Sequence, residues 1–172
     1  MKLINRSKYS HVYYNENTDE FLKLFFPTFS KKIKYFLGFR KYPGYNFKFI
    51  SDELNKLEIQ TVKITSCDKY SVTTKNINGV CLEQYINSNL NDPIIDTFVK
   101  MVAKILNNGI YYGDFAFDNF IVKNENIYAI DLEDYKKEKI LFHSSKEAIR
   151  RLYNTLPYSI AKRIEEEFKC SK

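Results

Sequence analysis

Three polar side chains stand close together in an otherwise apolar segment, GDFAFDNFIV, at residues 113–122. Asp114, Asp118 and Asn119 supply two carboxylates and an amide among aromatic neighbours. The structural alternatives are a loop carboxylate that caps backbone amides for Asp114 and a turn-forming side chain that hydrogen-bonds its own loop for Asn119. Carboxylate and amide oxygens are also the ligands that Mg²⁺ accepts in proteins. The segment therefore indicates a candidate site for cation-assisted chemistry.

A further carboxylate, Asp131, follows twelve residues after Asn119. A β-hairpin between these two residues would bring them close together. The runs NFIV and IYAID are separated by turn residues at 124–126, which predicts a short hairpin. Such a hairpin brings the start of its first strand close to the end of its second. We therefore expect Asn119 and Asp131 to be neighbours, with Asp114 opposite them.

These residue types fit phosphoryl transfer. Two oxygen ligands on adjacent strand ends suit Mg²⁺, which completes its coordination with water and phosphate oxygens. A carboxylate held nearby can accept the proton of an attacking hydroxyl. Positioning, charge neutralisation and one base are what phosphoryl transfer requires.

The elements expected to position this site are strands first and helices later. The helix over 92–109 has Asp92 as its N-cap and Pro93 at its first position. A Pro43-Gly44 break is expected before the helix over 46–58. The other expected elements are strands at 2–7, 10–16, 20–26, 60–65 and 70–77, a helix at about 30–37, and two C-terminal helices. This order predicts an α+β fold with a small antiparallel β-rich part and a helical part.

Lys23 is the candidate cation of the β-rich part. In the run FLKLF, a strand places it on the same face as Phe21 and Phe25, toward the interior or a cleft. A buried lysine without a partner is costly, which favours a phosphate or carboxylate partner. An edge-strand lysine that blocks further strand pairing is the alternative.

The segments together resemble the protein-kinase-like superfamily. GDFAFDNFIV and IYAID are similar to its catalytic loop and metal-binding hairpin, and EFLKLFF resembles the strand that carries its nucleotide-phosphate lysine. LNKLEIQTVKI, YSVTTKNINGVCLEQYI and FVKMVAKILNNGIYYGD follow in the order of the regulatory helix, the hinge and the long helix. Bacterial lipopolysaccharide core heptose kinases and small-molecule phosphotransferases are the most similar groups. The resemblance covers about residues 1–135.

The resemblance implies a role for each site residue, with ATP and Mg²⁺ as cofactors. Asp114 would be the catalytic base and Lys23 would neutralise the nucleotide phosphates. Asn119 and Asp131 would hold the metal, and groups near Asn78 would receive the adenine.

The chain departs from the family pattern at several positions. No glycine precedes Gly38, so the turn RSKYS would have to cover the phosphates through backbone amides and the hydroxyls of Ser7 and Ser10. Tyr112 stands where a histidine is usual. The position of the helix glutamate that pairs with the lysine falls near Phe47, which leaves Asp52, Glu53 or no residue as the partner of Lys23.

The metal-binding strand also departs from the pattern, because it ends in DLE instead of Asp-Phe-Gly. Glu133 and Asp134 therefore follow Asp131 closely. They either bind a second metal or face solvent.

Composition limits the class of partner. The net charge is +6 and the pI about 9.0, which predicts an anionic partner. Residues 30–42 mix five basic side chains with aromatic ones. A solvated helix face is one reading, and contact with an anionic membrane surface or substrate is another. Nucleic acid is disfavoured because no binding motif surrounds the patch. Three scattered cysteines argue against a disulfide framework and for a cytoplasmic location.

We therefore expect an ATP- and Mg²⁺-dependent phosphotransferase with a two-lobed kinase-like fold, residues 1–78 forming the nucleotide-phosphate lobe and 79–172 the reduced helical lobe. About forty residues follow Asp131, which disfavours a protein substrate. A sugar hydroxyl is preferred, and lipopolysaccharide core heptose at the inner face of the cytoplasmic membrane is the substrate that the resemblance suggests. The alternative is an inactive kinase-like protein, a pseudokinase that acts as a binding module.

Overall fold

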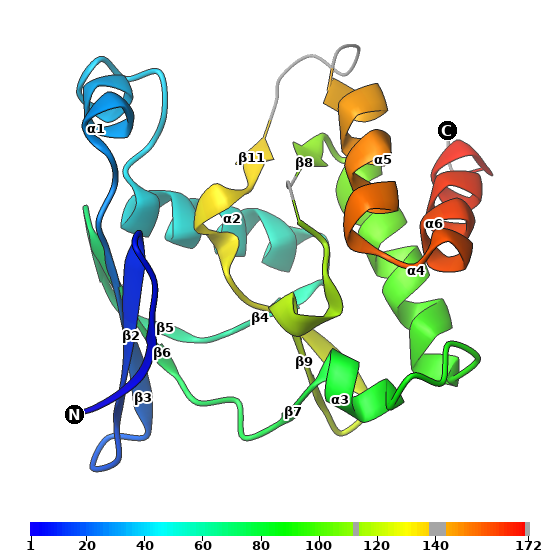
Figure 1. Cartoon of the computed structure of the whole chain (residues 1–172), viewed down its shortest axis with the longest axis horizontal. Helices are drawn as coiled ribbons and strands as arrows, with labels where there is room; N and C mark the ends of the chain where they lie inside the picture. The colour runs from blue at the N-terminus through cyan, green and yellow to red at the C-terminus, as the bar shows by residue number, and fades with distance from the viewer. Residues whose placement is uncertain (112–113, 138–143, 171–172) are drawn as a thin grey trace.

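Strands are concentrated in the first part of the chain and helices in the last part of the computed structural model (Figure 1). The structure describes residues 1–111, 114–137 and 144–170, without the side chains of residues 144 and 145. Tyr112 lies outside these ranges. The α+β class and its antiparallel N-terminal sheet are as the sequence predicts.

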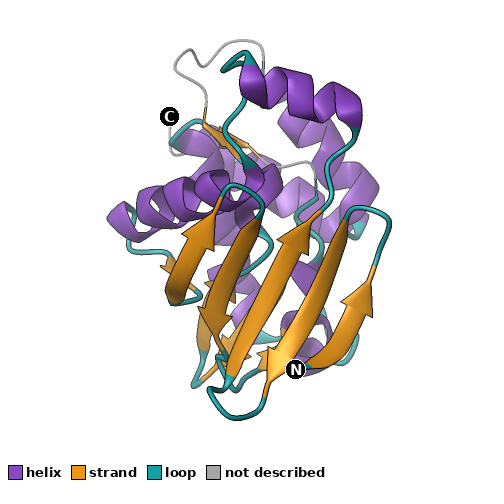
Figure 2. Cartoon of the chain, turned by 90° about the vertical axis from the view of Figure 1, so that its left-hand side faces the viewer, coloured by secondary structure: helices purple, strands orange, loops and turns teal. Residues whose placement is uncertain are grey.

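The N-terminal sheet has five strands in the order β1-β2-β3-β6-β5 (Figure 2). Lys23 lies in β3, the middle strand, and pairs with Val12 of β2 and Val72 of β6. The edge-strand alternative for this lysine is therefore wrong. The strands are β1 (Lys2–Arg6), β2 (Ser10–Asn15), β3 (Glu20–Phe25), β5 (Ile64–Asp68) and β6 (Ser71–Lys75).

Two helices, α1 (Phe29–Phe36) and α2 (Pro43–Lys56), connect β3 to the rest of the sheet. The expected break at Pro43-Gly44 is wrong, because α2 begins at Pro43. Proline is favoured at a first helical position, where its missing N–H has no intrahelical partner to lose. Helix α2 then packs between the sheet and the C-terminal part through its buried side chains, which include Phe47, Ile50 and Leu54.

The run QTVKIT is not one strand, contrary to the prediction. Its first residues form β4 (Gln60–Thr61), which pairs in parallel with β10 (Asn126–Ala129). Its last residues begin β5 of the N-terminal sheet. A period-2 pattern identifies extended backbone, but it does not say which neighbour the strand pairs with.

The predicted hairpin is present as β9 (Phe120–Lys123) and β10, and a second small sheet, β4-β10-β9-β7, is built around it. Strand β7 (Val80–Cys81) joins its outer edge. Further along the chain, β8 (Ile110–Tyr111) pairs with β11 (Lys136–Lys137). Two 3-10 turns, η1 (Phe117–Asn119) and η2 (Leu132–Asp134), flank the hairpin.

The C-terminal part is mainly helical. The predicted cap of its long helix is confirmed, since Asp92 accepts a hydrogen bond from the Ile94 amide at 3.0 Å and Pro93 follows it. The helices are α3 (Leu82–Ile86), α4 (Pro93–Asn107), α5 (Ser144–Thr155) and α6 (Tyr158–Cys170). Within the described ranges, every helix is too short or too polar to cross a bilayer.

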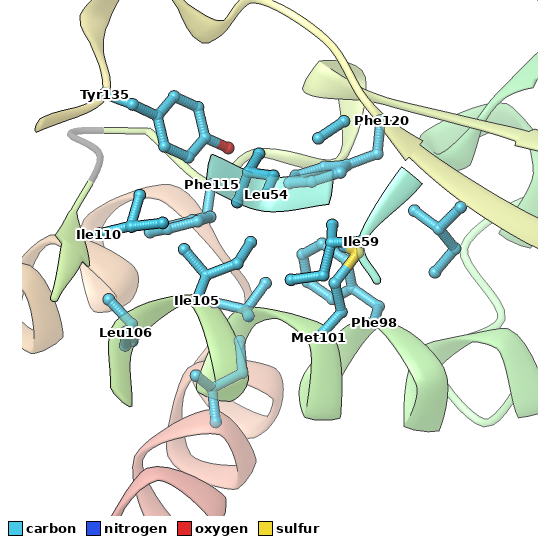
Figure 3. Packing of buried hydrophobic residues seen from close by; sticks show 14 of the residues in the cluster. Leu54, Ile59, Phe98, Met101, Ile105, Leu106, Ile110, Phe115, Phe120 and Tyr135 are labelled. Carbon is cyan, nitrogen blue, oxygen red and sulfur yellow. The ribbon is translucent and has the colours of Figure 1, made fainter. Parts of the chain in front are cut away.

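The core fills the space between the hairpin and α4. Figure 3 shows Phe115 and Phe120 of the polar loop packed with Phe98 and Ile105 of α4. Phe98 meets the ring of Phe120 edge to face at 5.0 Å between centroids. The aromatic residues around Asp114 thus anchor the loop in the core, and the polar side chains are free to face the other way.

Candidate active site

Lys23 reaches from the N-terminal sheet to two carboxylates that follow the hairpin. Its Nζ lies 2.8 Å from Oδ1 of Asp131 and 2.7 Å from Oε1 of Glu133. The side chain of Lys23 is 12% exposed and that of Glu133 14%, so the second pair is largely removed from solvent. The expected carboxylate partner exists, but it comes from the candidate metal-binding segment that follows the hairpin (residues 131–135) instead of the helix.

Burial and charge act in opposite directions on this cluster. Burial alone would lower the pKa of Lys23, but the carboxylates of Glu133 and Asp131 outweigh it and raise that pKa. Burial also raises the pKa of Glu133, in spite of the opposing attraction of Lys23, and the charge of Asp131 adds to the rise. One lysine thus holds two carboxylates that repel each other.

The acidic residues of α2 point elsewhere. Asp52 pairs with Lys48 at 3.0 Å. Glu53 pairs with Lys56 at 2.6 Å and with Lys137. Neither is the partner of Lys23, which contacts Asp131 and Glu133.

Helix α2 contacts the candidate metal-binding segment through Asn46 instead. The buried Asn46 amide donates from Nδ2 to the carbonyl oxygens of Glu133 and Tyr135, both at 2.9 Å. Sequence reasoning missed this residue. The available signal was a polar side chain one residue before Phe47 and four before Ile50, on the stripe of α2 that packs into the core.

Arg40 makes a second contact with this segment, through the other acidic residue that follows Asp131. Its guanidinium donates to Asp134 at 2.6 Å. Glu133 is mostly buried against Lys23, so the solvent-facing alternative is wrong for this residue, whereas the Asp134 side chain is 51% exposed and does face solvent. Both acidic residues that follow Asp131 are therefore held by basic side chains of the N-terminal part.

The hairpin brings Asn119 and Asp131 to the same end of the small sheet. Phe120 pairs with Ala129, and beyond this pair the Ile130 amide donates to the Asn119 carbonyl at 3.0 Å. Asp131 follows immediately, in a left-handed conformation with φ 59°. Aspartate adopts this conformation more readily than most residues, and the hairpin-turn residues Asn124 and Glu125 share it.

Asp114 is connected to this hairpin end through Asn119. The Asn119 amide donates from Nδ2 to the Asp114 carbonyl at 3.1 Å, so Oδ1 is the atom that could ligate a cation. The exposed Asp114 carboxylate accepts a hydrogen bond from the Ala116 amide at 3.1 Å, which fixes its orientation in the loop. Burial, followed by the charge of Asp114, raises the pKa of the neighbouring Asp118.

The turn between β1 and β2 is built from its own hydrogen bonds. Ser7 Oγ accepts from the amides of Tyr9 at 3.2 Å and Ser10 at 2.9 Å, and it lies 3.2 Å from Ser10 Oγ. The serines thus form a tight turn without glycine. Contact of Ser7 and Ser10 with phosphates stays a prediction.

Asn78, in the expected hinge, is fixed to the turn between β2 and β3. Its Nδ2 donates to Asp19 at 3.0 Å, and Asn76 donates to the same carboxylate at 3.0 Å. Hydrogen bonds from Tyr14, Asn78 and Asn76 lower the pKa of Asp19. The connection between the two parts of the molecule is thus hydrogen-bonded to the N-terminal sheet, and its contact with adenine stays a prediction.

The oxygen donors at the hairpin end fit Mg²⁺. The Asp131 side chain is 44% exposed, and Asn119 is hydrogen-bonded to Ile130, the residue before it, so a cation there could keep water and phosphate ligands. In the described ranges, no three His, Cys, Asp or Glu side chains form an all-protein metal cluster. Mg²⁺ that is bound together with a nucleotide does not need such a cluster.

The five-stranded sheet, the helix behind it and the helical part with its loop and hairpin define a protein-kinase-like fold. Solved structures confirm this class. The chain aligns with the ADP-bound aminoglycoside phosphotransferase APH(2'')-Ib with a TM-score of 0.65 at 11% identity, covering 98% of this chain and 76% of that one. It aligns with APH(2'')-IIa, solved with streptomycin and ATP, with a TM-score of 0.60 at 12% identity over 98% and 78%.

A third neighbour is the Rio2 kinase of Chaetomium thermophilum in an ADP, Mg²⁺ and phosphoaspartate complex, with a TM-score of 0.59 at 12% identity. The alignment covers 97% of this chain, which spans 61% of the length of the Rio2 chain. At these identities the similarity establishes the fold and not the reaction. The sequence matches no protein-family model, and no curated protein matches it significantly. The finer resemblance to heptose kinases stays a prediction.

Proposed function

We propose that the protein is a phosphotransferase that uses ATP and Mg²⁺ to phosphorylate a hydroxyl group. The observation that carries the proposal is the meeting of three groups at one place. Lys23 of the N-terminal sheet contacts Asp131. The residue before Asp131 is hydrogen-bonded to Asn119, and the Asn119 side chain is hydrogen-bonded to the Asp114 carbonyl. Phosphoryl transfer requires such a cation, such metal ligands and such a base together.

Each residue has a defined task in this proposal. Lys23 neutralises nucleotide phosphates, and Glu133 holds it in place. Asn119 and Asp131 are the residues that would hold Mg²⁺, which supplies positive charge at the phosphates when bound. Asp114 orients the acceptor hydroxyl and takes its proton.

We further propose a small, sugar-like acceptor. The fold neighbours include aminoglycoside phosphotransferases, which favours a small molecule. The sequence resemblance favours a heptose of lipopolysaccharide core, met in the cytoplasm at the inner membrane face. The nucleotide would lie between the lobes formed by residues 1–78 and 79–172.

A thermal-unfolding experiment with ATP tests nucleotide and metal binding. A ligand present at a hundred times its Kd stabilises the folded state by about 2.7 kcal/mol, and the melting temperature of a domain of this size should rise by several degrees. We expect this rise with Mg²⁺, its loss with EDTA, and its loss in Asp131→Asn. The control Asp96→Asn changes an exposed carboxylate on α4 and should keep the rise.

Activity against sugar acceptors tests the base. We expect Asp114→Asn to lower kcat by roughly 10²- to 10⁴-fold, the range found for general bases, while the melting temperature stays unchanged. Asp118→Asn, in the same loop, is the matched comparison. If Asp118→Asn abolishes turnover and Asp114→Asn does not, the assignment of the base is wrong.

The competing function is a pseudokinase binding module. It is favoured by the Ser7–Ser10 turn, whose hydrogen bonds are made internally, and by Lys23, which already has two carboxylate partners. The absence of any melting shift at millimolar Mg²⁺-ATP would support this function and contradict phosphotransfer.

A further inference from the structure

Helix α1 carries an apolar stripe that faces away from the rest of the protein. Phe29, Ile33, Phe36 and Leu37 follow one another at spacings of four, three and one, which places them on one side of the helix. Phe29 is 79% and Phe36 83% exposed. Phe26, Ile33, Leu37 and Phe39 are exposed as well, and together these six side chains form what we call the α1 patch.

The orientation of α1 is fixed from its other side. Tyr35 is the buried residue of the helix, and its ring packs against that of Tyr42 at 5.5 Å. The helix therefore cannot rotate to bury the stripe without exposing the Tyr35 ring to solvent. An amphipathic helix normally turns such a stripe to the core, and large exposed apolar patches mark interaction sites.

The surroundings of the α1 patch are basic. Residues 26–42, which carry the patch, contain no Asp or Glu but four lysines and one arginine, and that arginine, Arg40, is paired with Asp134. Lys32 and Lys34 are exposed on either side of the stripe. Lys31 lies with its Nζ 5.7 Å from the ring centre of Tyr9, which adds a further aromatic side chain to this surface. An apolar stripe between lysines is the pattern of helices that lie in the interface of anionic membranes.

The α1 patch also lies next to the candidate active site. The Phe26 amide donates to the Tyr9 carbonyl at 2.7 Å, which ties the start of the patch to the β1–β2 turn. On the other side, Arg40 is paired with Asp134, three residues after Asp131. Figure 1 shows α1 at the upper end of the sheet and the connection from β6 to β7, which contains Asn78, at the lower end.

We propose that the α1 patch docks the protein on an anionic phospholipid surface. The aromatic side chains enter the headgroup boundary, and the lysines contact lipid phosphates. Charge favours lipid over a second copy of this chain, because two such basic surfaces would repel each other. Where the proposed phosphotransfer holds, docking through α1 brings the candidate active site, to which Arg40 is linked through Asp134, close to the membrane surface.

Vesicle co-sedimentation tests the proposal without nucleotide, so its outcome is independent of the proposed reaction. The full chain is mixed with vesicles of phosphatidylcholine alone or with phosphatidylglycerol added. We expect binding to the anionic vesicles only. Phe29→Ser/Phe36→Ser should weaken it at least tenfold, whereas Tyr158→Ser, which removes an exposed aromatic ring on α6, should not change it.

Substituting the lysines of α1 provides a second, quantitative test of vesicle binding. Each lysine near an anionic surface contributes about 1 kcal/mol, or about fivefold in affinity. Lys31→Gln/Lys32→Gln/Lys34→Gln should therefore weaken binding by about a hundredfold, and unchanged melting temperatures show that the variants fold.

Three outcomes overturn the proposal. The first is no binding of the wild-type chain to anionic vesicles. The second is binding that Phe29→Ser/Phe36→Ser leaves intact. The third is a concentration-dependent dimer, abolished by the same variant, which would make a second copy of the chain the occupant.

Discussion

At the residue scale, Lys23 shows how a buried charge is tolerated. Two carboxylates surround it, and one of them, Glu133, stands where the protein-kinase pattern has glycine. The helix that usually supplies the counter-charge instead supplies an amide, Asn46, to the backbone of the same segment. The partners of the lysine therefore come from the η2 turn that follows the hairpin and not from the helix.

A double-mutant cycle should measure the interaction energy between Lys23 and Glu133. Lys23→Met leaves the buried carboxylate of Glu133 beside Asp131 without its cation, which should lower the free energy of unfolding by about 3 kcal/mol at neutral pH. Adding Glu133→Gln removes the stranded charge and should restore most of this loss. Urea unfolding of the wild-type chain, both single variants and the double variant gives the interaction energy. Strictly additive effects would show that Glu133 does not stabilise Lys23.

Local spacing explains why some of the site could be predicted and some could not. The spacing between Asn119 and Asp131 is set within one hairpin, so the alternating pattern and the turn residues were enough to place both. The partner of Lys23 lies more than a hundred residues away in the sequence, and no local period encodes it. Glu133 could be identified only as a departure from a family pattern.

At the element scale, the start of α2 shows how closely the helix approaches the sheet. A side chain added at Gly44 would overlap the Asp68 carbonyl oxygen and lie 2.5 Å from that of Ser71, in the β5–β6 turn. The sequence signal Pro43-Gly44 is ambiguous because it fits both a turn and a helix start. The close packing of Gly44 against the ends of β5 and β6 stabilises the helix start at Pro43. This packing is a tertiary contact, so local residue preferences could not predict it.

Gly44→Ala should therefore destabilise the protein by overpacking, by about 3 kcal/mol, at the upper end of the usual range. The atoms in the way are backbone atoms, so they cannot move aside by changing rotamer. Gly38→Ala is the comparison, since Gly38 has φ 74° and open space around it, and only backbone strain of about 1 kcal/mol is expected there. Chemical unfolding of both variants measures the difference. A smaller effect at Gly44 than at Gly38 would contradict the close approach.

At the scale of the whole molecule, the segment that follows the hairpin belongs to both parts of the protein. It continues the chain of the C-terminal part, but Lys23, Arg40 and Asn46 of the N-terminal part hold residues 131–135. The candidate metal ligand Asp131 therefore cannot move independently of the sheet that carries the candidate phosphate-binding lysine. This arrangement favours a site whose two halves are aligned before any ligand arrives.

Asn46→Ala tests whether this alignment depends on α2. The change removes two hydrogen bonds and leaves the carbonyl oxygens of Glu133 and Tyr135 without this donor, at about 1 kcal/mol or more for each bond. We expect a lower melting temperature and faster amide hydrogen exchange over residues 131–137, together with weaker Mg²⁺-ATP binding. Asn55→Ala, an exposed position on the same helix, should leave all three unchanged. If exchange accelerates uniformly along the chain, Asn46 supports global stability alone, and the alignment of the site must come from Lys23 and Arg40.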